Sequence, residues 1–111
     1  MKVTVSSQRI GWHKYPGHPK LGNLHRHIFY VWVTFDEKRS REVEFFEAQE
    51  EVQGCLDDLK LLSCDESGLS CEDIGLHILR AIGCHSCVVS EDKENFIHVN
   101  RADLVSNDIL S

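Results

Sequence analysis

The alternation of apolar and polar residues predicts strands in both halves of the chain. Residues 2–12 carry Val3, Val5 and Ile10 among Thr and Ser, a pattern typical of a half-exposed strand. Residues 24–35 are rich in aromatic and β-branched residues and predict a second strand, apolar on both faces apart from Arg26. Such a strand has helices on one face and a neighbouring subunit on the other, or a central place in a larger sheet. Residues 86–91 and 96–99 predict a hairpin that turns at 92–95.

Between these strands the apolar period changes to three and four residues, which predicts two amphipathic helices. The first extends from Phe45 to about Leu62. The second begins after Ser70, which forms a capping-box pattern with Asp73, and ends near Gly83. The order strand, strand, helix, helix, strand, strand predicts an α+β fold, with an antiparallel four-stranded sheet and two helices packed on one face.

Length and charge set the class of protein. A chain of 111 residues makes one domain, which we place at residues 1–101, and residues 102–111 give no strong signal and are expected to form a C-terminal tail. A net charge of −6 with scattered Lys and Arg argues against a nucleic-acid or membrane partner. The N-terminus lacks the apolar region of a secretory signal, and the longest apolar run, 28–33, is too short to span a bilayer, so we expect a cytoplasmic protein.

Cysteine usage fits a reducing compartment. The chain has five cysteines, an odd number without the density of a disulfide scaffold: Cys55, Cys64, Cys71, Cys84 and Cys87. The segment from Cys84 to Cys87 has the C-x-x-C form of a redox or zinc motif. It lacks a second such pair and leads into an apolar strand, so we favour buried, inert thiols.

Three histidines border the loop at residues 14–23. Because side chains alternate along a strand, His25 and His27 share one face, and the loop can fold His13 back onto them. Three neutral imidazoles with one open position are the ligand set of a catalytic zinc site. The spacing alone leaves open a pair of sheet histidines satisfied by local hydrogen bonds.

With this element order, these histidines resemble the 6-pyruvoyl-tetrahydropterin synthase and 6-carboxytetrahydropterin synthase family over about residues 8–100. The resemblance implies the T-fold (tunnelling fold), with His13, His25 and His27 as zinc ligands. It also implies that Glu91 holds a pterin. Relatives of this fold assemble into barrels with sites at the interfaces, so the resemblance implies a homo-oligomer, a trimer or a hexamer, in which Glu91 serves its own or a neighbouring subunit.

The same resemblance places Cys71 and Glu72 on the family's substrate-binding segment before the second helix. As a helix N-terminus favours a thiolate, Cys71 could be reactive, and a partly buried structural cysteine is the alternative.

Three departures from the family concern proton transfer. Leu21 stands where the family has its reactive cysteine, and Leu59 stands where the histidine of an Asp-His motif belongs, although Asp57 keeps the aspartate. Arg26 replaces the glycine between the paired histidines. General acid-base catalysis would then fall to Asp57 and Asp58, or to His18, Lys20 or a metal-bound water.

These features lead to three hypotheses. The chain is a zinc-dependent lyase acting on a dihydroneopterin-like substrate with altered proton-transfer groups, or a catalytically inactive protein that binds a pterin or purine. The third is a structural or interaction protein on the T-fold. Zinc is the expected cofactor in the first two.

Overall fold

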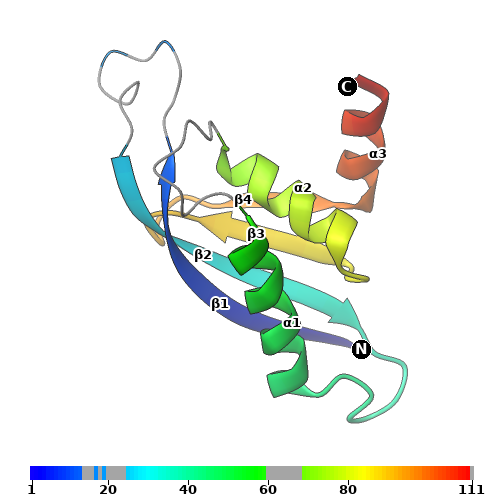
Figure 1. Cartoon of the computed structure of the whole chain (residues 1–111). Coiled ribbons are helices and arrows are strands. Elements are labelled where there is room, and N and C mark those ends of the chain that lie inside the picture. The colour runs from blue at the N-terminus through cyan, green and yellow to red at the C-terminus, as the bar shows by residue number, and fades with distance from the viewer. Residues whose placement is uncertain (14–16, 18, 20–24, 60–68, 111) are drawn as a thin grey trace.

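A four-stranded antiparallel sheet forms the frame of the molecule (Figure 1). The computed structural model describes residues 1–13, 17, 19, 25–59 and 69–110, apart from the side chains of residues 12, 13, 25 and 106–110. The strands are β1 (Lys2–His13), β2 (His25–Asp36), β3 (Ser86–Ser90) and β4 (Ile97–Asn100), and they lie side by side in this order. The predicted α+β class and the antiparallel sheet are thus confirmed, whereas assignment to the T-fold stays a prediction.

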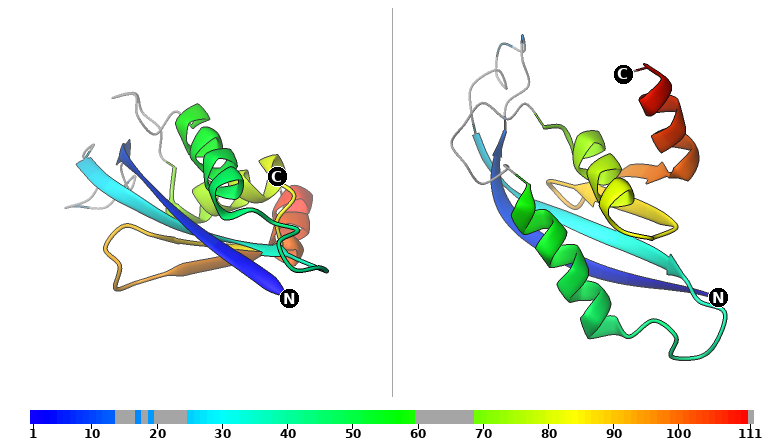
Figure 2. Two further views of the ribbon diagram at one scale, coloured as in Figure 1. Left: turned by 90° about the horizontal axis from the view of Figure 1, so that it is seen from below. Right: turned by 45° about the vertical axis from the view of Figure 1, so that its right-hand side comes forward.

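Helices α1 (Phe45–Asp58) and α2 (Cys71–Ala81) cover the same face of this sheet, as Figure 2 shows from two further sides. Helix α1 packs on β1, and α2 packs on β3 and β4. The predicted capping box opens α2: the Ser70 hydroxyl accepts from the Asp73 N–H, and the Asp73 carboxylate accepts from the Ser70 N–H. Within the described residues, no helix is long and apolar enough to cross a membrane.

The predicted end of α1 at Leu62 is wrong. The helix ends at Asp58, because Leu59 adopts an extended backbone (φ −73°, ψ 135°) and its side chain is buried in the core. Residues 60–68, which include the predicted turn at 63–68, lie outside the described residues.

The core lies between the sheet and the two helices. On β2, alternate residues from Phe29 to Phe35 are buried there, and they meet the apolar stripe of α2 at Ile74, Ile78 and Leu79. The other face of the sheet carries no helix, and Ile10, Ile28 and Phe96 are 48%, 39% and 43% exposed. The alternation predicted along β2 is therefore confirmed, with one face buried and the other face open.

Strands β1 and β2 extend beyond the rest of the sheet. They pair along their whole length, from Lys2 opposite Asp36 to His13 opposite His25. Strand β3 pairs with β2 only from Thr34 to Tyr30. Residues 25–29 of β2 therefore have a partner strand on one side and an open edge on the other (Figure 1).

The expected C-terminal tail is instead a third helix, α3 (Arg101–Leu110). Asn100 caps its first turn: the Asn100 side chain accepts from the N–H groups of Ala102 (2.9 Å) and Asp103 (3.3 Å), and the Asp103 carboxylate accepts from the Asn100 N–H (2.9 Å). The prediction of a tail failed because this reciprocal cap, of the same form as the one at Ser70, was not read as a helix start.

Arg101 anchors the beginning of α3 to the end of α2. Its guanidinium donates to the carbonyl oxygens of Leu79 (2.6 Å), Ile82 (2.9 Å) and Cys84 (3.0 Å). The last carbonyls of a helix have no partner within the helix, so this one side chain satisfies groups that α2 leaves open. We call Arg101 and these three carbonyls the Arg101 corner.

Candidate functional site

The three histidine positions lie on one face at the projecting end of β1 and β2. His13 is directly opposite His25, and His27 is directly opposite Gly11. Residues opposite each other in an antiparallel pair share a face, and so do residues two apart along a strand, which places positions 13, 25 and 27 together. This is the face that α1 and α2 cover further along the sheet, where Phe29 is buried.

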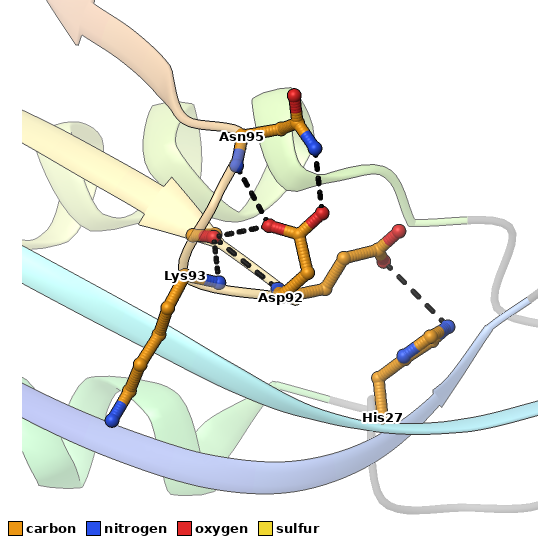
Figure 3. Close-up of polar contacts among 6 residues, drawn as sticks. His27, Asp92, Lys93 and Asn95 are labelled. Atoms are coloured by element: carbon orange, nitrogen blue, oxygen red, sulfur yellow. Dashed lines mark hydrogen bonds and ion pairs between the residues drawn. The ribbon is translucent and has the colours of Figure 1, made fainter.

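His27 lies beside Glu91, which follows the last residue of β3. The Nε2 atom of His27 is 3.9 Å from a carboxylate oxygen of Glu91, and the two side chains are 31% and 34% exposed (Figure 3). The His27 ring also meets the Phe29 ring edge to face, with the centroids 6.2 Å apart. Two predicted site residues from distant parts of the chain therefore come together, and we call them the His27–Glu91 corner.

A hydrogen-bonded turn holds the backbone next to Glu91 (Figure 3). The buried Ser90 hydroxyl accepts from the N–H groups of Asp92 (3.3 Å) and Lys93 (2.8 Å). The Asp92 carboxylate accepts from the backbone and the side chain of Asn95, both at 2.8 Å, and from the Glu94 N–H at 2.8 Å. These bonds to Asn95 and Glu94 hold the pKa of Asp92 well below its usual range. Glu91 is thus fixed on both sides by residues that sequence reasoning treated only as a hairpin turn.

Cys71 is the first residue of α2 and lies near this corner. Burial raises the pKa of its thiol to about 12, and the negative charges of Glu91, Glu72 and Asp92 add to the effect. The thiol therefore stays protonated at neutral pH, which favours the structural reading of Cys71 over a reactive thiolate. Glu72 is exposed on the same helical turn.

The other cysteines are equally unreactive. Cys55, Cys84 and Cys87 are buried and free, and burial raises the pKa of Cys87 to about 12 and that of Cys55 to about 11. The prediction of buried thiols in the C-x-x-C segment is confirmed.

The candidate acid-base residues lie at the end of α1. Asp57 accepts from Arg9 at 2.7 Å and from the Gln53 amide at 3.0 Å, so its carboxylate is engaged in a partly exposed ion pair. Asp58 is exposed. Arg9 lies opposite Phe29, one residue pair of this face away from the pair of Gly11 and His27, which brings Asp57 to the same part of the sheet. Leu21, His18 and Lys20 lie outside the described residues.

A cavity of about 290 Å³ opens at the unpaired edge of β2. It joins both faces of the strand, since His27 and Glu91 line it from one face and the rest of its lining comes from the other: Ile10, Arg26, Ile28 and Tyr30. On its far side the Lys93 ammonium stands 4.4 Å from the centre of the Tyr30 ring. Sequence reasoning placed Arg26 opposite the metal ligands and missed that the end of β3 opens a passage between the two faces.

The donor set suits a zinc ion better than a hard cation, because imidazole nitrogens are preferred zinc ligands and the positions fall on one face. Among the side chains that the structure describes, no group of three or more His, Cys, Asp and Glu is arranged to hold a metal ion. Only His27 of the three proposed ligands belongs to those side chains. The proposed triad is therefore neither supported nor excluded by this finding.

Comparison with known proteins does not assign a family. No protein-family model matches the chain, and no curated protein matches it.

Proposed function

We propose that this chain is a zinc-binding protein similar to 6-pyruvoyl-tetrahydropterin synthase, with a T-fold, that binds a pterin-like heterocycle. His13, His25 and His27 hold the zinc ion, and Glu91 holds the heterocycle. The observation that carries the proposal is the position of Glu91, 3.9 Å from His27 on the face shared by the three histidine positions. A carboxylate at this place can accept two parallel hydrogen bonds from the N–H groups along one edge of a pterin. Bound zinc would supply Lewis-acid polarisation of a ligand oxygen.

Binding without turnover is the version of this function that we favour. Leu59 is a buried apolar residue where the resemblance requires a histidine, and Leu21 has no ionisable group. The Cys71 thiol stays protonated, so it does not supply a replacement nucleophile. The chain's remaining acid near the site, Asp57, is held by Arg9.

A zinc-dependent lyase is the second candidate, and Asp57 is the observation that favours it. The Arg9 ion pair keeps Asp57 ionised on the same face as the histidine positions, where it could accept a proton from a substrate side chain. In this version Asp58 has the weaker case, because it is exposed and the structure gives it no fixed partner among the described residues.

Assembly into a homo-oligomer, a trimer or a hexamer, belongs to the same proposal. The face of the sheet without helices carries Ile10, Ile28 and Phe96 half-exposed, and Trp32 meets Phe96 edge to face with the centroids 5.6 Å apart. Apolar surface of this kind is suited to contact with a further copy. Because Glu91 reaches His27 of its own chain, each subunit would then carry its own anchor for the heterocycle.

Calorimetry with zinc-loaded protein and pterin tests the proposal. We expect binding by the wild type, loss of at least tenfold in affinity for Glu91→Gln, and no change for Glu94→Gln, an exposed carboxylate of the same turn. Equal binding by wild type and Glu91→Gln, or no binding at all, would contradict it. Incubation with dihydroneopterin triphosphate separates the two candidates, since only the lyase forms product and loses it on Asp57→Asn.

A further inference from the structure

The direction of the backbone groups of β2 can be derived from two hydrogen bonds. The Thr34 carbonyl accepts from the His85 N–H at 2.7 Å, so the peptide groups of Thr34 face β3. On β1, the Ser6 carbonyl accepts from the Gln49 side chain at 3.0 Å, which places it at the free edge and away from β2. Trp32, directly opposite Ser6, therefore also turns its peptide groups toward β3.

The same alternation brings two residues beyond the end of β3 into play. The pairing of β1 with β2 is continuous, without a bulge, so Arg26 and Ile28 point their N–H and C=O groups to the same side as Trp32 and Thr34. Strand β3 stops opposite Tyr30 and does not pair with them. Their peptide groups thus face the cavity of about 290 Å³ that Glu91 and His27 line from the other side.

Arg26 adds a positive charge to this cavity. It is exposed, and no ion pair to it is found among the described residues. A guanidinium carries donors in a planar fork that matches the geometry of a carboxylate or a phosphate. A molecule held by Glu91 at the inner end of the cavity can pass the open edge of β2 and reach Arg26 at the outer end, because the one cavity is lined by both residues.

We propose that Arg26, together with the N–H group of Ile28, determines specificity for a ligand that carries an oxyanion, either a carboxylate or a phosphate, on its side chain. The proposal rests on the proposed function, since Glu91 holds the ring of the same ligand. It deepens that function by requiring a ligand with a neutral ring edge at one end and an anion at the other. Arg26 is a binding residue here, with no part in proton transfer.

Two pairs of probes test the proposal on the zinc-loaded full chain by calorimetry. Pterin is compared with pterin-6-carboxylate, and dihydroneopterin with dihydroneopterin triphosphate. We expect the wild type to bind the anionic member about tenfold more tightly in at least one pair, as a charge-assisted hydrogen bond would give. A preference in the first pair only identifies a carboxylate, and a preference in the second pair only identifies a phosphate.

Variants at Arg26 assign the preference to this residue. Arg26→Gln is expected to bind both members of a pair equally and to bind neutral pterin as the wild type does, whereas Arg26→Lys keeps part of the preference. Arg39→Gln removes an exposed arginine of the loop after β2 and serves as the matched control. A preference that survives Arg26→Gln overturns the proposal. If no probe binds to the wild type, the proposed function itself fails; if neutral pterin binds but Arg26→Gln changes nothing, only the specificity role fails.

Proline at position 28 tests the role of the backbone. Because the Ile28 N–H faces the open edge, Ile28→Pro removes this donor without breaking the ladder to β1. We expect it to weaken binding of the anionic probe more than Ile28→Ala, which removes only side-chain contacts, while circular dichroism confirms that both variants fold. Equal binding by folded Ile28→Pro and Ile28→Ala would exclude the Ile28 N–H from the subsite.

Discussion

Two corners of the molecule use charged side chains in opposite ways. In the Arg101 corner, one guanidinium donates to three carbonyl oxygens of the chain itself. In the His27–Glu91 corner, the closest approach is 3.9 Å, longer than a hydrogen bond, and a cavity opens beside the pair. The first corner spends its polar groups on closing the fold, and the second leaves room for a further molecule between its groups. Removal of a charge should therefore affect stability at the first corner and ligand binding at the second.

The largest effect is expected for Arg101→Met. It keeps much of the side-chain stem and leaves the carbonyls of Leu79, Ile82 and Cys84 without their donor, so the free energy of unfolding should fall by about 3 kcal/mol. Urea unfolding followed by circular dichroism measures this loss, with Arg39→Met as a control on an exposed arginine. Pterin affinity of the folded fraction should stay unchanged. A loss of stability no larger than in the control would show that Arg101 does not hold α3 to α2.

A smaller effect, with a change of sign between two glycines, is expected in the helices that link the corners. A Cβ on Gly75 would come within 2.6 Å of a methyl group of Val99, so Gly75→Ala should lower the free energy of unfolding by about 1 kcal/mol. A Cβ on Gly54 meets nothing within 4 Å, and Gly54→Ala should raise it by about 0.5–1 kcal/mol through helix propensity alone. Parallel thermal unfolding of the two variants makes the comparison. The same sign in both would mean that α2 does not pack on β4 as closely as described.

The smallest effect on stability is expected for Glu91→Gln. The His27–Glu91 pair is about one-third exposed and is separated by 3.9 Å, so the change should cost less than about 1 kcal/mol of unfolding free energy. The same variant should lose pterin binding, which reverses the behaviour of Arg101→Met. Urea unfolding and calorimetry on one preparation give both values, and a variant that loses stability but keeps its ligand would contradict the contrast between the corners.

Local patterns were sufficient for most of the elements. The period-two pattern of β2 and the capping box at Ser70 predicted structure correctly because they depend on neighbours in the sequence. Helix α3 carried the same kind of signal, Asn100 followed by Asp103, and was missed because its apolar stripe is weak and short. The early end of α1 depends on the burial of Leu59, which is a tertiary effect that periodicity does not report.

The candidate site was predictable only in part. Strand alternation placed His25 and His27 on one face, and the register of β1 with β2 then brought His13 opposite His25. The cavity at Arg26 could not be derived, because it exists only where β3 ends four residues after it leaves Thr34's partner, Ser86. The bonds of Arg101 join residues 17 to 22 positions apart, a separation at which no local pattern specifies a partner.

The zinc content of the purified full chain tests the central claim most directly. After loading with zinc and dialysis, we predict one zinc ion per chain in the wild type and in His98→Ala, whose histidine is exposed on β4, and much less in His27→Ala. Equal zinc content in all three proteins, or none in the wild type, would contradict a metal site on the shared histidine face.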